Sequence, residues 1–125
     1  MKKINKKILI VEDDADFLAL LQERVALEGF SVFIARDGKE GLDVASKERP
    51  DLILLDILMP KMDGIEMAKR LKESGINISI IFLTNVGDVD YISKAIEASQ
   101  SDYIVKSNIS IDDIIARVKD KLGVK

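Results

Sequence analysis

Short apolar runs alternate with longer amphipathic segments along the whole chain, and this alternation predicts its elements. The runs are too short for helices and are bounded by polar residues or turn signals, which is typical of strands buried on both faces of a sheet. We expect five strands, at Ile8–Val11, Ser31–Ala35, Leu52–Leu55, Ile78–Leu83 and Tyr103–Val105.

The segments between these strands have apolar residues at helical spacing. Their apolar positions are Phe17, Leu20, Leu21 and Val25; Leu42 and Ala45, within 38–47; Ile65, Ala68 and Leu71; Val89, Ile92 and Ile96; and Ile111, Ile114, Ile115, Val118 and Leu122. Asp14 and Ser110 are typical N-caps for the first and last of these helices. Gly29, Gly75 and Gly123 stand where helices commonly end.

A strand followed by a helix, five times over, predicts an α/β fold. We expect a single doubly wound five-stranded parallel sheet with helices on both faces and right-handed crossovers. With 125 residues and no visible linker, the chain is expected to form one domain.

Composition narrows the chemistry. The chain has no Cys and no His, which removes thiolate and imidazole chemistry and the usual zinc ligands. A net charge of −3 argues against direct nucleic-acid binding. The apolar run after the N-terminal lysines stops at Glu12, too soon for a signal peptide. The chain contains no run of about 20 apolar residues, the length needed to span a membrane. We therefore expect a cytoplasmic protein that does not bind membranes.

Polar side chains follow four of the five predicted strands. Glu12 and Asp13 follow the first strand, Asp56 the third, Thr84 the fourth and Lys106 the fifth. Because parallel strands direct their carboxyl ends to one edge of the sheet, where ligands bind in open α/β folds, these side chains should gather there. For Asp56 alone, the simpler alternative is a cap of the following turn at Pro60 and Gly64; the whole set favours a site.

This set of side chains indicates phosphoryl chemistry. Clustered carboxylates repel one another and favour a bound cation, and all-oxygen ligands favour Mg²⁺ or Mn²⁺. Lys106 and Thr84 are suited to contact phosphoryl oxygens. Asp56 could be the nucleophile, because aspartyl phosphates are a known type of covalent intermediate.

With these features, the chain resembles the receiver domain of bacterial two-component response regulators over essentially its whole length, 1–125. The motifs that carry the resemblance are Ile10-Val11-Glu12-Asp13-Asp14, Asp51-Leu-Ile-Leu-Leu-Asp56, Met59-Pro60-Lys-Met-Asp63-Gly64, Phe82-Leu83-Thr84 and Asp102-Tyr103-Ile104-Val105-Lys106. The resemblance implies the flavodoxin-like (βα)5 fold with strand order 2-1-3-4-5.

The same resemblance implies a Mg²⁺-dependent phosphoacceptor. Asp56 would accept a phosphoryl group from a sensor histidine kinase or a phosphotransfer protein. Asp13, Asp56 and the backbone carbonyl of Leu58 would ligate the Mg²⁺, with Glu12 acting mainly through water. The chain would be a signalling domain that catalyses its own phosphorylation and slow dephosphorylation, and not an enzyme acting on other substrates.

By resemblance, Thr84 and Lys106 would hold the phosphate. Tyr103 would be the aromatic switch residue that turns inward when Thr84 moves, and its ordinary alternative is a half-exposed strand aromatic. The switch would alter the face of the fourth helix, fifth strand and last helix, where a downstream effector, an output domain beyond this chain or a second copy would bind.

Two positions depart from the family pattern and keep alternatives open. Ser107 follows Lys106 where the family usually has a proline with a cis bond, so we expect a trans Lys106–Ser107 bond and a shifted or more mobile segment up to Ser110. Asn85 replaces a small residue after Thr84. Both departures leave open an alternative function, that of a degenerate receiver that binds partners without phosphorylation. The sequence is less compatible with a flavodoxin-like electron carrier. Such a protein binds the phosphate of its cofactor after the first strand, where the carboxylates of this chain would repel it.

Overall fold

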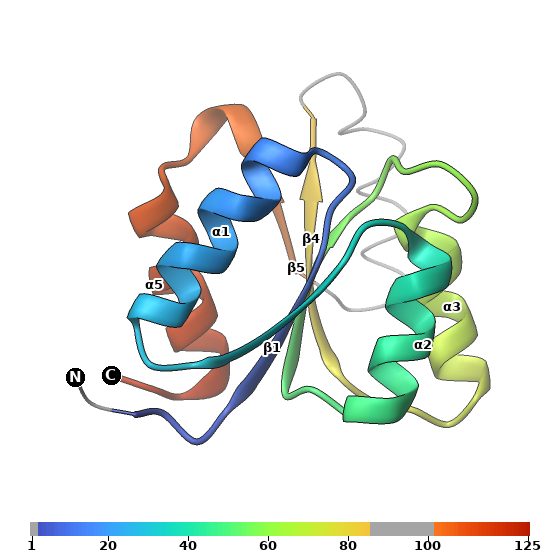
Figure 1. Ribbon diagram of the computed structural model, residues 1–125, viewed down its shortest axis with the longest axis horizontal. Helices are drawn as coiled ribbons and strands as arrows, with labels where there is room; N and C mark the ends of the chain where they lie inside the picture. Colours follow the sequence, from blue (N-terminus) through green and yellow to red (C-terminus); the bar gives the residue numbers. More distant parts are fainter. Residues whose placement is uncertain (1–2, 86–101) are drawn as a thin grey trace.

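The computed structural model describes residues 3–85 and 102–125, and its centre is a five-stranded parallel sheet (Figure 1). The strands are β1 (Lys7–Val11), β2 (Ser31–Ala35), β3 (Leu52–Asp56), β4 (Ser79–Thr84) and β5 (Asp102–Val105). Their order is β2-β1-β3-β4-β5, and every neighbouring pair is parallel. The expected fold class and strand order are confirmed.

Helices cover both faces of the sheet. Helices α1 (Ala15–Leu27) and α5 (Ile111–Leu122) lie on one face, and α2 (Gly38–Glu48) and α3 (Gly64–Glu73) lie on the other (Figure 1). The helix expected around Val89, Ile92 and Ile96 lies outside the described residues. Among the described residues, no helix is both long and apolar enough to cross a membrane.

The central strands divide their side chains between two cores. In β1, Ile8 and Ile10 join the core under α1 and α5, whereas Leu9 and Val11 join the core under α2 and α3. All four are fully buried, because successive side chains of a strand point to opposite faces and both faces are covered. This double burial is why the strand sequences are continuous apolar runs.

The buried face of α1 differs from the expected one. Leu18, Leu21 and Val25 are its buried residues, whereas Leu20 is 46% exposed and Phe17 is partly buried. The segment from 17 to 21 is continuously apolar, so it is compatible with two helix faces, and packing on the sheet selects the one through Leu18.

A similar difference is found in α3. Met67 and Leu71 are fully or almost fully buried in the core under α2 and α3, whereas Ile65 and Ala68 are only partly buried there. The unbranched Met67 side chain thus occupies the centre of this helix face, a position that the sequence pattern assigned to its neighbours.

Caps fix the helix ends as expected. The Asp14 carboxylate accepts hydrogen bonds from the first-turn amides of α1. Ser110 and Asp113 form a capping box at the start of α5, and Gly123 ends that helix in the left-handed conformation at φ 68°. These caps determine where α1 and α5 begin beside the carboxyl edge of the sheet.

Candidate functional site

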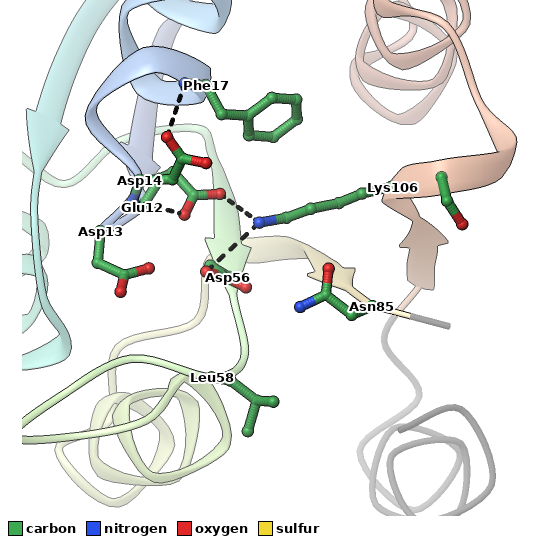
Figure 2. Close-up of a pocket in the computed structure, with 9 residues that line it drawn as sticks. Glu12, Asp13, Asp14, Phe17, Asp56, Leu58, Asn85 and Lys106 are labelled. Carbon is green, nitrogen blue, oxygen red and sulfur yellow. Dashed lines mark hydrogen bonds and ion pairs between the residues drawn. The ribbon is translucent and has the colours of Figure 1, made fainter. Parts of the chain in front are cut away.

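The carboxyl edge of the sheet is hollowed into a pocket of about 500 Å³ (Figure 2). Residues that follow β1, β3, β4 and β5, together with the first turn of α1, supply its walls. Its lining residues are Glu12, Asp13, Asp14, Phe17, Asp56, Leu58, Asn85, Lys106 and Ser107. The expected gathering of strand-end side chains is therefore present for Glu12, Asp13, Asp56 and Lys106.

Three carboxylates form the acidic part of the pocket. Glu12, Asp13 and Asp56 each place one oxygen within 4.8 Å of the others. Glu12 is fully buried and Asp56 is 4% exposed, whereas Asp13 is exposed. Glu12 is held from both ends, since its backbone N–H donates to the Ala35 carbonyl (3.0 Å) and its Oε2 accepts from the Asp14 N–H (3.0 Å). This compact oxygen set fits a divalent cation.

The Lys106 ammonium contacts two of these carboxylates (Figure 2). Its Nζ is 2.6 Å from Glu12 Oε1 and 3.4 Å from Asp56 Oδ2. The same Nζ is 4.9 Å from the centroid of the Phe17 ring. One cation thus partly compensates two buried anions, which leaves the pocket short of positive charge.

The protonation of Asp56 and Lys106 reflects this charge balance. Burial, followed by the hydrogen bond and the negative charge of Glu12, raises the pKa of Asp56 to about 8, against the lowering effect of Lys106. Burial alone would lower the pKa of Lys106, but the hydrogen bond to Glu12 and the charge of Asp56 outweigh it and raise that pKa. A further cation beside Asp56 would favour its ionised form.

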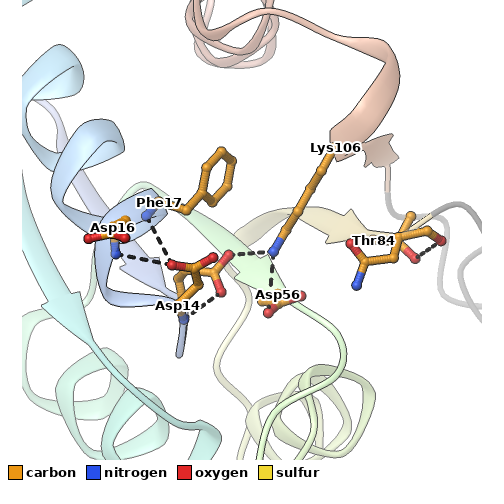
Figure 3. A network of polar contacts seen from close by, with 8 residues as sticks. Asp14, Asp16, Phe17, Asp56, Thr84 and Lys106 are labelled. Atoms are coloured by element: carbon orange, nitrogen blue, oxygen red, sulfur yellow. Dashed lines mark hydrogen bonds and ion pairs between the residues drawn. The ribbon is translucent and has the colours of Figure 1, made fainter.

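Thr84 occupies the end of β4 but does not line the pocket. It is 2% exposed, and its hydroxyl donates to the Asn85 carbonyl oxygen at 3.3 Å (Figure 3). Thr84 therefore lies at the carboxyl edge of the sheet, as expected, but in this conformation its hydroxyl bonds to the adjacent backbone and the residue does not line the pocket. Tyr103, on β5, is partly buried against the core under α2 and α3.

The loop from β3 to α3 is held by close backbone contacts. The Gly64 N–H donates to the Ile57 carbonyl at 2.8 Å, and Lys61 forms an ion pair with Asp37 (3.5 Å). A Cβ on Gly64 would overlap the carbonyl oxygen of Asp56. Leu58, whose carbonyl was expected to ligate Mg²⁺, lines the pocket from this loop and is 52% exposed.

The segment after Lys106 is a 3₁₀ turn, Lys106–Asn108. No peptide bond in the described part of the chain is cis, so the predicted trans Lys106–Ser107 bond is confirmed. The turn brings Ser107 to the pocket wall.

Sequence reasoning missed Phe17 as a pocket residue and left the contribution of Asn85 and Ser107 open. All three line the pocket. The hydrophobic pattern predicts only a core position for Phe17, because a phenylalanine at helical spacing has the same pattern whether its ring packs on the sheet or faces a strand end. Its place in the first turn after Asp13 and Asp14 is the signal that points to the pocket.

Comparison with known proteins identifies the family. The family model for the response regulator receiver domain matches residues 8–119, so the chain belongs to the receiver domains of response regulators. It is 42% identical over 122 residues to the sporulation initiation phosphotransferase F of Bacillus subtilis, covering 98% of each chain. It is 39% identical to the alkaline phosphatase synthesis transcriptional regulatory protein PhoP of the same species, covering 93% of this chain and 48% of that protein.

Solved structures agree with this assignment. A CheY-like response regulator receiver domain protein from Methanospirillum hungatei superimposes with a TM-score of 0.86 at 30% identity, covering 96% of this chain and 95% of that one. The Francisella response regulator 1452 receiver domain gives a TM-score of 0.83 at 30% identity, covering 92% and 94%.

Proposed function

We propose that this chain is a phosphoacceptor whose Asp56 receives a phosphoryl group in a Mg²⁺-dependent reaction, and that residues 1–125 act as one receiver domain in the cytoplasm. The observation that carries the proposal is the Lys106 ammonium between Glu12 and Asp56, at a pocket open to a phosphoryl donor. Family membership supports the same role.

In the proposed reaction, an Asp56 carboxylate oxygen attacks phosphorus. The new bond is Asp56 O–P, and the bond that breaks is P–N of a phosphohistidine, whose electron pair returns to the imidazole nitrogen. Lys106 lies where it can hold a phosphoryl oxygen, and Thr84 would have to leave the Asn85 carbonyl to do so. Water later attacks phosphorus, releasing inorganic phosphate and restoring the carboxylate.

The donor set fits Mg²⁺. The ion would be held by Asp13, Asp56 and the Leu58 carbonyl, with Glu12 acting through water. Three clustered acidic side chains have only one ammonium among them, so an added cation would improve the charge balance. When bound, Mg²⁺ supplies charge neutralisation for the transferring phosphoryl oxygens. The chain's own part is to orient the buried Asp56 side chain in the pocket and to place the Lys106 ammonium beside it.

Incubation with Mg²⁺ and acetyl phosphate tests the proposal. We expect the intact mass to increase by one phosphoryl group, and the increase to be absent in Asp56→Asn and in EDTA. A parent protein that gains no mass under these conditions would leave the degenerate receiver, which binds partners without phosphorylation, as the better assignment.

Metal binding is expected to raise the melting temperature. Mg²⁺ that binds the folded site and not the unfolded chain stabilises by linkage, by about 2.7 kcal/mol at one hundred times Kd. A melting titration at millimolar Mg²⁺ measures this shift, and Asp13→Ala should abolish it. Asp16→Ala, one turn away in α1 and outside the pocket lining, is the matched control. An unchanged midpoint in the parent would contradict the metal site.

The phosphorylated form is expected to be long-lived. Leu58 lines the pocket with an apolar side chain, and Val86, which lies outside the described residues, is also apolar. Neither can orient a hydrolytic water by hydrogen bonding, as a polar side chain could. We expect faster decay in Mg²⁺ for the double variant Leu58→Asn with Val86→Glu. Equal decay rates would place control of the lifetime elsewhere, with Asn85 the next candidate.

The partners follow from the proposed reaction. A sensor histidine kinase or a phosphotransfer protein would supply the phosphoryl group, and the similarity to a phosphotransferase over nearly its whole length supports exchange with other proteins. Thr84 and Tyr103 would link phosphorylation to the face that includes β5 and α5, where an effector, an output domain or a second copy would bind. The chain spans about half the length of PhoP, so that protein's activity is not carried over.

A further inference from the structure

The Lys106 ammonium makes three contacts in the pocket, with Glu12, Asp56 and the Phe17 ring. It begins the 3₁₀ turn Lys106–Asn108, which has no side-chain cap hydrogen bond. Its long side chain is nevertheless only 18% exposed, and its Nζ contacts Glu12 and Asp56. A lysine has a flexible four-carbon stem, so holding this ammonium in one place requires contacts around its end.

The Phe17 ring supplies a contact that the carboxylates do not. Figure 2 shows the ring and Asp56 on different sides of the ammonium. The 4.9 Å between Nζ and the ring centroid lies within the range of a cation–π interaction. Phe17 is itself fixed, since its N–H donates to Asp14 Oδ1 at 3.3 Å and its side chain packs against the core under α1 and α5.

We propose that Phe17 is a positioning residue for Lys106, whose ring face holds the ammonium beside Asp56 so that it meets the phosphoryl group as this forms. The ring occupies a side of Nζ that water would otherwise solvate, and a less hydrated ammonium interacts more strongly with an anion. This inference rests on the proposed function of the site. Its alternative is that Phe17 only packs on the core, and the test must separate the two.

The first measurement does not depend on phosphorylation. Phe17→Leu keeps an apolar side chain of similar size and removes the ring. In urea unfolding without divalent cations, we expect it to lower the folding equilibrium constant about threefold to tenfold more in the parent than in a Lys106→Met background. Equal losses in the two backgrounds would show that Phe17 only packs on the core and would overturn the inference.

The second measurement is the rate of phosphorylation by acetyl phosphate at saturating Mg²⁺. We expect Phe17→Leu to lower the rate constant about threefold to tenfold, Phe17→Tyr to keep it near the parent value, and Phe17→Leu to have no further effect in the Lys106→Met background. The Mg²⁺-dependent melting shift should stay unchanged in Phe17→Leu. Equal rate losses with and without Lys106 would contradict the positioning role.

The chain offers a matched control at Phe33. The Lys7 ammonium lies 5.8 Å from the Phe33 ring centroid, and neither residue lines the pocket. Phe33→Leu removes a similar ring contact and should leave the phosphorylation rate unchanged; a loss equal to that of Phe17→Leu would overturn the inference. If the parent is not phosphorylated at all, the proposed function fails, and the unfolding cycle alone decides whether Phe17 holds the ammonium.

Discussion

Replacing Asp56 by asparagine is expected to stabilise the divalent-free protein at pH 8 while it abolishes phosphorylation. Asp56 is 4% exposed, and burial together with Glu12 raises the pKa of its carboxyl to about 8 in the folded protein, from an ordinary value of 3.8. The folded state therefore binds more protons than the unfolded state between these values, and the parent loses stability as the pH rises through that window. Asparagine has no such titration.

Urea unfolding in EDTA measures this effect. The unfolding free energy of Asp56→Asn should equal that of the parent near pH 4 and exceed it by about 1–4 kcal/mol above pH 8. Adding Mg²⁺ should narrow the gap, because a bound cation stabilises the ionised carboxylate. Asp43→Asn, at an exposed position of α2, is the control and should show no pH-dependent gain. A gap that does not grow with pH would contradict the raised pKa.

Gly64→Ala is expected to lower the unfolding free energy by about 1–3 kcal/mol, the usual cost of overpacking a close contact. A Cβ at Gly64 would overlap the Asp56 carbonyl oxygen and would approach the Cα of Ile57 to 3.0 Å. These are backbone atoms, which cannot move aside as the end of a side chain can. The strain falls on Asp56, the proposed phosphoacceptor and Mg²⁺ ligand, so the Mg²⁺-dependent melting shift should also decrease.

Gly41→Ala is the matched control for this substitution. Its Cβ would meet the sulfur of Met67 at 2.9 Å and Cγ2 of Val11 at 3.0 Å, which are side-chain and not backbone atoms. Alanine also gains about 1 kcal/mol of helix propensity over glycine within α2. We expect its unfolding free energy to remain within about 1 kcal/mol of the parent value and its Mg²⁺ response to be unchanged. Equal losses for the two variants would show that the backbone contact at Gly64 is not special.

The strands and the acidic site could be predicted because both depend on strong, local signals. Leu52–Leu55 reads as a continuous apolar run because both faces of β3 are covered, and Asp56 stands out at its end for the same reason. Once the strands are parallel, their ends share one edge, so the proximity of Glu12, Asp56 and Lys106 follows from the order of elements.

The remaining details depend on packing and on the choice between competing partners. Leu18 and Leu20 are equally apolar, and only contact with the sheet decides which one is buried. The Thr84 hydroxyl can bond to a ligand or to its neighbouring carbonyl, and the sequence contains no information on which state is populated. The hydrophobic pattern places Phe17 against the core, where its side chain does pack, but it contains no information on whether the residue also lines the pocket.

The distribution of the two cores along the chain has a consequence for synthesis on the ribosome. In the described part of the chain, the buried residues of the core under α2 and α3 lie between Leu9 and Phe82. The opposite core, under α1 and α5, includes residues up to Val118. An ion pair also joins these two helices, between Arg24 and Asp112 (2.5 Å), which are 88 residues apart in sequence. A nascent chain whose α5 is still inside the ribosome therefore exposes an apolar sheet face. We expect chaperones to bind the chain at this stage of synthesis.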